Sequence, residues 1–303
     1  MSRIRYSRSN ATSRVPLESG RSRGIVGWVR EQYNRGGGTG SGAGPDGRGA
    51  AGVLPERPTR RLPGSGIIFP SMKASDTERL KRAAAARALE FVTSGTVIGL
   101  GTGSTVRPLL ALLAERLASG ALRDVVAVPT SEDTARRCRE AGIPLTTLAE
   151  HPSLALAVDG ADEVSPRLDL IKGLGGALLR EKLVAQAARR FIVVADESKL
   201  VRRLGTRAPV PVEVVPFGWS TLLPFFEQLG SRPELRRGPD GEPVVTDNGN
   251  YLVDCRFPRG IADPAALARA LARRTGIVED GLFLRLARVA VVAGAGGVRL
   301  LRR

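Results

Sequence analysis

Short apolar runs alternate with helix-forming segments along the chain from residue 77 onward. The apolar runs have the length of buried strands and cover residues 96–100, 125–128, 154–158 and 191–195. The segments between and before them have the composition and spacing of helices and cover residues 77–93, 106–117, 132–141 and 177–190. This alternation predicts a mostly parallel sheet with helices on both faces, that is, a Rossmann-like α/β fold.

The pattern changes after about residue 204. The segments PVPVEVVPF, VVTDNGNYLVDCRF and GIVEDGLFL are punctuated by Pro and Asn-Gly, and a helix is expected between residues 263 and 274. These features predict a smaller α+β domain of the ferredoxin-like kind, with a hairpin, before residues 287–293 return as one more strand. We therefore expect a catalytic domain of residues 72–204 plus 285–303 and a smaller domain of residues 205–284.

Residues 1–71 differ in composition from the remainder. They hold 12 arginines, no lysine, four acidic residues and 14 glycines, and they carry half of the formal net charge of +16. No apolar periodicity runs through them, so we expect a disordered leader. Three interpretations stay open: an organelle transit peptide, a basic nucleic-acid-binding arm, or translation from a start codon placed too early. The last is favoured because Met72, the only methionine after Met1, directly precedes the first predicted helix.

The composition excludes several kinds of chemistry. His151 is the only histidine, and Cys138 and Cys255 are the only cysteines, which excludes zinc sites, Ser-His triads and disulfide frameworks. Acid-base chemistry must then fall to carboxylates and lysines, and we expect neither a metal nor a cofactor. No basic stripe is interleaved with aromatic residues, so no nucleic-acid partner is expected.

The same composition bears on location. Two isolated thiols and the lack of a secretory signal are typical of a reducing cytosol, so we expect a cytoplasmic protein. No run approaches the roughly 18 to 20 apolar residues that a membrane span needs.

The motif DGADEV follows the apolar run that ends at residue 158. Asp159 and Asp162 are therefore expected at the carboxyl end of a parallel strand, where open α/β sheets hold their ligands. Two carboxylates held close together tend to raise the pKa of one of them into a range useful for catalysis. The structural alternative is that either acid only caps the following segment.

The motif KGLGGALLREK comes next. Its glycines, Gly173, Gly175 and Gly176, predict a helix N-terminus suited to anions, with Lys172 before it and Glu181 about one turn inside. Lysine is scarce, at positions 73, 81, 172, 182 and 199 against 41 arginines, and a compact ammonium can approach a developing oxyanion where a guanidinium cannot replace it. The alternative for Glu181 is a solvated ion pair with its basic neighbours.

A third motif, GLGTGSTV at residues 99–106, opens a helix after the first strand. Its glycines and the hydroxyls of Thr102, Ser104 and Thr105 predict a loop that binds phosphate or sugar hydroxyls. A dinucleotide site is disfavoured, because GxGxxG fails at Ser104 and no acidic residue ends the second strand.

Together these motifs resemble ribose-5-phosphate isomerase of the A type, in the order found in that family. The matching segments between residues 77 and 295 are GLGTGSTV, DGADEV, KGLGGALLREK, ADESKLV, PVEVVPF, VTDNGNYLVDC and GIVEDGLF. The resemblance implies reversible interconversion of ribose 5-phosphate and ribulose 5-phosphate through an enediol, without a cofactor. It also implies a homodimer or homotetramer. The molecule that the protein binds would be a small sugar phosphate, its substrate.

The resemblance further assigns roles to residues. It implies Glu181 as the proton acceptor. As a hypothesis for the reaction, Asp159 assists ring opening, and Lys172 with Asp162 stabilises the charge that moves between O1 and O2. The implied substrate-binding residues are Thr102, Gly103, Ser104, Thr105, Asp159, Gly160, Ala161, Asp162, Lys172, Gly173, Leu174, Gly175 and Lys199. Leu174 departs from the family, in which many members have glycine, and Leu179 stands where some carry a hydroxyl residue.

Alternatives of two kinds remain, a binding protein without catalytic activity and another enzyme on the same scaffold. A non-catalytic sugar-phosphate-binding regulatory protein would need a helix-turn-helix, and residues 1–71 contain no amphipathic helix pair to supply one. A coenzyme A transferase would need a nucleophilic glutamate in a different context, and an amino-sugar phosphate isomerase normally relies on a histidine that is absent here.

Overall fold

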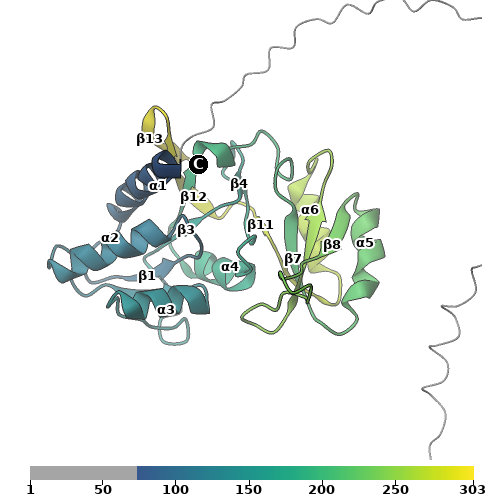
Figure 1. Ribbon diagram of the computed structural model, residues 1–303, viewed down its shortest axis with the longest axis horizontal. Helices are drawn as coiled ribbons and strands as arrows, with labels where there is room; N and C mark the ends of the chain where they lie inside the picture. Colours follow the sequence, from purple (N-terminus) through teal and green to yellow (C-terminus); the bar gives the residue numbers. More distant parts are fainter. Residues whose placement is uncertain (1–73) are drawn as a thin grey trace, which may run out of the picture. The chain divides into compact units, whose positions relative to one another are not determined.

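A computed structural model describes residues 74–303, with side chains from residue 78, and its main element is a six-stranded sheet (Figure 1). The strands lie in the order β13-β12-β6-β3-β1-β2. Their bounds are β1 (Val97–Leu100), β2 (Val126–Pro129), β3 (Leu156–Gly160), β6 (Phe191–Asp196), β12 (Ala287–Gly294) and β13 (Gly297–Arg302). Only the edge strand β13 runs antiparallel to its neighbour in this sheet. The predicted mostly parallel α/β sheet is confirmed.

Helices cover both faces of this sheet. They are α1 (Ala74–Leu89), α2 (Arg107–Ala118), α3 (Glu132–Glu140) and α4 (Leu178–Ala187). Ile192 and Val194 of β6 belong to the core cluster formed with α1 and α2, whereas Val193 belongs to the cluster that contains Val184 of α4. This alternation along β6 follows from the period of two in a strand and explains why the strand is apolar throughout.

A smaller antiparallel sheet follows in the order β10-β7-β9-β8. Its strands are β7 (Val210–Val214), β8 (Arg232–Leu235), β9 (Tyr251–Arg256) and β10 (Ile277–Asp280), and its helices are α5 (Leu223–Gln228) and α6 (Pro264–Ala272). Phe226 of α5 and Leu267 of α6 pack with Val212 and Val253 in one core cluster. The element order β-α-β-β-α-β is the ferredoxin-like arrangement that the sequence predicted.

A third sheet of very short strands was not predicted. It has the order β11-β5-β4, with β4 (Glu163–Val164), β5 (Leu170–Ile171) and β11 (Leu282–Phe283). Two-residue strands are too short to produce an alternating pattern in a sequence. Strand β11 directly follows β10, and Gly281 between them accepts a hydrogen bond from the backbone N–H of Lys172 (2.9 Å). This sheet therefore brings the segment before α4 close to the small antiparallel sheet.

One boundary differs from the expectation in a way that matters for the site. Strand β3 runs to Gly160, which pairs with Val194, so Asp159 lies within the strand rather than after it. The short 3-10 helix η1 (Glu197–Lys199) directly follows β6 and carries Lys199. The leader of residues 1–71, with its three interpretations, lies outside the described residues.

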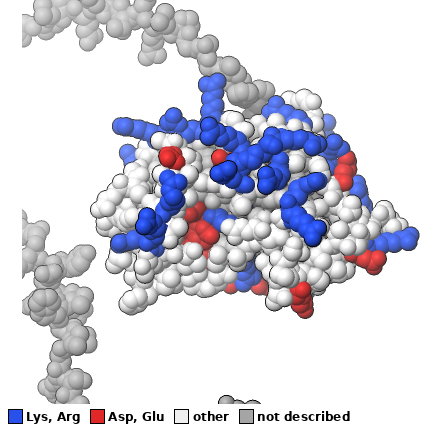
Figure 2. Space-filling model, turned by 180° about the vertical axis from the view of Figure 1, so that it is seen from behind, with Lys and Arg blue, Asp and Glu red and all other residues white. Residues whose placement is uncertain are grey.

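Among the charged side chains on the face seen in Figure 2, Lys and Arg are more extensive than Asp and Glu. Within residues 74–303, no helix has the length and apolar character needed to cross a membrane.

Candidate active site

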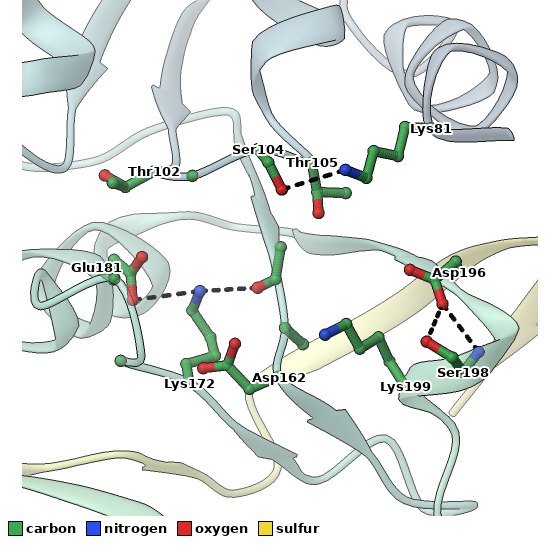
Figure 3. A pocket seen from close by; sticks show the side chains of 15 residues that line it. Lys81, Thr102, Ser104, Thr105, Asp162, Lys172, Glu181, Asp196, Ser198 and Lys199 are labelled. Carbon is green, nitrogen blue, oxygen red and sulfur yellow. Dashed lines mark hydrogen bonds and ion pairs between the residues drawn. The ribbon is translucent and has the colours of Figure 1, made fainter. Parts of the chain in front are cut away.

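The pocket lies at the carboxyl ends of β1, β3 and β6, with a cavity volume of about 370 Å³. This is the edge of the sheet that the sequence predicted, and the volume falls in the range of small-molecule sites. The residues lining it are Lys81, Thr102, Gly103, Ser104, Thr105, Gly160, Ala161, Asp162, Lys172, Gly173, Gly175, Glu181, Asp196, Ser198 and Lys199. Figure 3 shows how their side chains lie around the cavity.

At the inner end of the pocket, one lysine contacts two carboxylates. The ammonium of Lys172 lies 3.0 Å from Oδ2 of Asp159 and 3.2 Å from Oε2 of Glu181, and it donates to the carbonyl oxygen of Gly160 (2.7 Å). All three charged side chains are at most 5% exposed. The ring of Phe283 lies 5.4 Å from the same ammonium, which adds a cation-π contact.

Burial and mutual contact change the protonation of these groups. Burial raises the pKa of Glu181 to about 8, and the neighbouring Asp159 carboxylate acts in the same direction, against the Lys172 ammonium. Burial likewise raises the pKa of Asp159, against the effect of Lys172. Burial alone would lower the pKa of Lys172, but Asp159 and Glu181 together raise it above its ordinary value. Lys172 therefore stays charged, while Glu181 can exchange a proton near neutral pH.

A glycine at position 101 makes this arrangement possible. A Cβ atom there would lie 1.9 Å from Oδ1 of Asp159, so any other residue would displace the carboxylate. The same oxygen accepts hydrogen bonds from the backbone N–H groups of Thr102 (3.2 Å) and Gly160 (2.7 Å). The glycine loop after β1 thus fixes Asp159 as well as lining the pocket.

The outer end of the pocket carries cations and hydroxyls. Lys81 on α1 donates to Oγ of Ser104 (3.3 Å), and Lys199 extends into the pocket from η1 (Figure 3). Thr105 and Ser198 also line this end. Two ammonium groups beside hydroxyls and the N-terminus of α2 form a site suited to a phosphate.

Lys81, Asp196 and Ser198 were not among the residues that the sequence singled out. Asp196 accepts hydrogen bonds from the backbone N–H and the hydroxyl of Ser198, which shapes the turn that carries Lys199. The scarcity of lysine was the one signal for Lys81, which is one of only five lysines in the chain. Its position on the first helix, far from the other motifs in sequence, did not connect it with the pocket.

Two of the expected site residues do not line the cavity. Asp159 is buried beneath it and contacts Lys172, and Leu174 has a side chain 44% exposed at the surface. The backbone N–H of Leu174 nevertheless donates to Oδ2 of Asp162 (3.0 Å), which does line the cavity. Leu174 therefore contributes to the site through its backbone N–H rather than through its side chain.

The two basic neighbours of Glu181 do not form ion pairs with it. Arg180 donates to Glu132 (2.7 Å) and to the side chain of Asn248 (3.0 Å). Lys182 is buried and contacts Glu279 (2.7 Å) and Asp280 (3.3 Å). The solvated-pair interpretation of Glu181 is therefore wrong. Among residues 74–303, no group of three or more His, Cys, Asp or Glu side chains is arranged to hold a metal ion.

Comparison with known proteins gives consistent matches. A family model described as ribose 5-phosphate isomerase A (phosphoriboisomerase A) matches residues 126–297. Ribose-5-phosphate isomerase A of Roseiflexus castenholzii is 56% identical over 223 residues, covering 74% of this chain and 95% of the relative. A probable chloroplastic ribose-5-phosphate isomerase 3 of Arabidopsis thaliana is 44% identical over 256 residues, covering 82% of this chain and 92% of the relative.

Solved structures agree with these sequence relatives. A D-ribose-5-phosphate isomerase in complex with phospho-erythronic acid is 42% identical, with a TM-score of 0.73, covering 75% of this chain and 99% of that one. The ribose 5-phosphate isomerase of Plasmodium falciparum is 39% identical, with a TM-score of 0.72 and the same coverage of both chains.

Proposed function

The chain belongs to the ribose 5-phosphate isomerase A family, and we propose how its pocket interconverts ribose 5-phosphate and ribulose 5-phosphate. The enzyme is an aldose-ketose isomerase. The non-catalytic regulatory protein considered above is not favoured, because the relatives that span about three quarters of the chain are isomerases.

The observation that carries the proposed mechanism is the buried cluster of Glu181, Lys172 and Asp159. A base for aldose-ketose isomerisation must accept a proton from C2 and return it to C1, so its pKa should lie near the working pH. The carboxylate of Glu181, with a pKa raised to about 8, meets this requirement. We assign the proton transfer to Glu181.

The charge that develops on the substrate needs stabilisation next to this base. When Glu181 takes the C2 proton, the electron pair moves through the new C1–C2 double bond to O1, forming an enediolate. Lys172, whose ammonium lies 3.2 Å from the Glu181 carboxylate, is placed to stabilise that oxyanion. A preorganised charge of this kind is usually the largest single contribution to catalysis.

The reaction is completed by moving a second proton. The O2 hydroxyl proton passes to O1 while Glu181 returns its proton to C1, which leaves a ketone at C2. We assign this O2-to-O1 exchange to Asp162, whose carboxylate lines the pocket and accepts from the N–H of Leu174. Asp159 keeps Lys172 protonated, and we propose that it also assists the opening of the furanose ring.

The phosphate is assigned to the outer end of the pocket. Lys81 and Lys199 supply positive charge there, and Ser104 and Thr105 supply hydroxyls. A solved relative is titled as a complex with phospho-erythronic acid. We infer that this chain binds the same compound, because its phosphate suits the outer cations and its carboxylate resembles the charged O1 end of the enediolate.

Further assignments concern the whole chain. We propose a catalytic domain of residues 72–204 plus 285–303 and a smaller domain of residues 205–284. We also propose that the enzyme acts in the non-oxidative branch of the pentose phosphate pathway, in the cytoplasm, as a homodimer or homotetramer. The support is the family membership and the sheets described above.

The test is ketose formation by the full chain in buffer containing EDTA, with ribose 5-phosphate and unphosphorylated ribose as matched substrates. We expect ribulose 5-phosphate to form without added metal, and ribose to react far more slowly because it lacks the group that Lys81 and Lys199 bind. No ketose from ribose 5-phosphate would contradict the function. Equal rates with ribose would contradict the phosphate assignment.

A further inference from the structure

Arg236 directly follows β8 of the small antiparallel sheet. It contacts the segment of residues 172–175, the substrate loop. Its Nε donates to Oδ2 of Asp254 on β9 (2.8 Å), and its Nη2 donates to Oδ1 of the same carboxylate. The remaining nitrogen, Nη1, donates to the carbonyl oxygens of Gly173 (3.1 Å) and Leu174 (3.0 Å). The side chain of Arg236 is only 15% exposed.

The direction of Nη1 is fixed by the pair with Asp254. A guanidinium is planar, and two parallel hydrogen bonds to one carboxylate set both its position and its plane. Asp254 itself is held in the strand ladder, where it pairs with Glu234 of β8 and Pro211 of β7. The two carbonyls are therefore bound to a donor that cannot rotate freely.

Holding the carbonyls also orients the amide groups of the loop. In a trans peptide unit the C=O and N–H bonds point in opposite directions, so a fixed carbonyl fixes the N–H of the next residue. The carbonyl of Gly173 shares a peptide unit with the N–H of Leu174, which donates to Asp162 (3.0 Å). The carbonyl of Leu174 shares one with the N–H of Gly175, a residue that lines the pocket.

We propose that Arg236, held by Asp254, is a positioning residue of the isomerase. It fixes the two peptide units on either side of Leu174, so that one N–H orients the Asp162 carboxylate and the next is presented to the substrate. The proposal rests on the proposed function. It also accounts for Leu174, because a loop held through its carbonyl groups keeps its backbone conformation while the leucine side chain stays 44% exposed.

A residue with this role affects substrate binding more than the chemistry at Glu181. The N–H of Gly175 contacts ground state and transition state alike, so loosening it weakens binding of both, whereas the N–H of Leu174 acts only through Asp162. Glu181 and Lys172 are not bonded to Arg236, so the pH dependence set by Glu181 should not change. An arginine that only stabilised the fold would leave the kinetics of the folded enzyme unchanged.

The experiment compares R236K and D254N with the matched control R237K in the full chain. Arg237, the next residue, donates to the carbonyl of Gly241 within its own hairpin and has no contact with the loop. For each variant, KM and kcat for ribose 5-phosphate, the inhibition constant of phospho-erythronic acid, the pH profile and the thermal midpoint are measured. Lysine keeps the charge of Arg236 but cannot bind Asp254 and both carbonyls in one plane.

We expect KM and the inhibition constant to rise about tenfold in R236K and D254N, the size of effect that one or two lost hydrogen bonds produce. The change in kcat should be smaller, and the midpoint of the pH profile should not change. In all of these measurements R237K should behave like the wild type. Wild-type values in both R236K and D254N would overturn the proposal, and so would equal changes in R237K. If R236K does not fold, D254N alone decides between these outcomes.

The test also separates this inference from the proposed function. If the wild-type chain binds phospho-erythronic acid but does not isomerise ribose 5-phosphate, the function fails while the affinity ratio of R236K to wild type still tests the role of Arg236. If the wild type is active and R236K has wild-type KM and affinity, only the inference about Arg236 fails.

Discussion

Three charged side chains with almost no contact with solvent lie together at the inner end of the pocket. Lys172 lies between Asp159 and Glu181, and the cluster carries two carboxylates for one ammonium. The excess of negative charge and the burial both favour a protonated Glu181. The proton leaves Glu181 near neutral pH rather than in acid, which is where a reversible proton carrier is most effective.

The first prediction follows from this protonation. Glu181 must be ionised to take the C2 proton, so kcat/KM should increase with pH, reach half of its maximum near pH 8 and level off above about pH 9. The phosphate of the substrate ionises near pH 6, below this window. Initial rates at low substrate concentration between pH 6.5 and 9.5 measure the profile. A kcat/KM that is constant over this interval would contradict a raised pKa of Glu181.

The second prediction concerns the outer cations. K81M and K199M should each raise KM for ribose 5-phosphate by about 10- to 100-fold, because charge-assisted hydrogen bonds contribute about 1.5–3 kcal/mol. The expected change in kcat is smaller, since the phosphate does not take part in the proton transfer. The slow turnover of unphosphorylated ribose serves as the internal control and should be unaffected. An equal loss with both substrates would show that these lysines act elsewhere.

At the scale of elements, helix α4 connects the two larger sheets. Val184 packs in the cluster under the six-stranded sheet, and Lys182 reaches β10 of the antiparallel sheet through Glu279 and Asp280. The ring of Phe283 lies 5.1 Å from the Lys182 ammonium and 5.4 Å from that of Lys172. The helix that carries Glu181 is therefore fixed from both sides.

The third prediction is that K182M destabilises the protein strongly. Removing the ammonium leaves the buried carboxylate of Asp280 uncompensated, and breaking one side of a buried pair costs about 3–5 kcal/mol. The matched control is R136M, which removes exposed pairs with Asp133 and Glu140 on α3 and should destabilise the protein far less. Urea unfolding at pH 7 measures both. Similar losses in the two variants would contradict the structural role of Lys182.

The elements that the sequence predicted well are those with long apolar runs. The strands at residues 96–100 and 191–195 were found within about one residue of β1 and β6, because a buried parallel strand is apolar throughout. The end of β3 was missed, since Asp159 and Gly160 are polar or small and resemble a turn. The short strands β4, β5 and β11 carry too few residues for any periodic signal.

The candidate site was predictable to a similar extent. The motifs located Lys172, Asp162 and Glu181, because glycine turns and carboxylates after a strand leave a local signature. They could not locate Lys81 or Arg236, whose positions depend on contacts between segments distant in sequence. The sequence Arg180-Glu181-Lys182 alone also could not show that the two basic side chains face away from Glu181. Their orientation depends on contacts with segments distant in sequence, including the small antiparallel sheet.

At the scale of the whole molecule, both larger sheets contribute to one pocket. Gly160 of β3 and Asp196 of β6 in the six-stranded sheet line the pocket, while Arg236, next to β8, and Gly281, next to β10, hold the loop before α4 by hydrogen bonds. A Cβ atom at Gly281 would lie 2.3 Å from the carbonyl oxygen of Lys172, so the backbones meet there without any side chain between them. The geometry of the pocket therefore depends on both sheets remaining folded.

The fourth prediction is that a ligand stabilises the fold as a whole. Phospho-erythronic acid at 100 times its dissociation constant should raise the free energy of unfolding by about 2.7 kcal/mol, the amount set by mass action. Denaturant unfolding with and without the compound measures this shift. K199M serves as the control, because at the same ligand concentration its weaker binding should give a much smaller shift. Equal shifts in the two proteins would contradict the phosphate site.

In the proposed mechanism Glu181 carries the proton between C2 and C1, and the fifth prediction concerns this assignment. The measurement is kcat for ribose 5-phosphate together with the dissociation constant of phospho-erythronic acid, in the wild type and in E181Q. Glutamine keeps the size of the side chain but cannot act as a base, so kcat should fall by about 10²- to 10⁴-fold while binding is retained. A turnover in E181Q close to that of the wild type would contradict the assignment of Glu181 as the base.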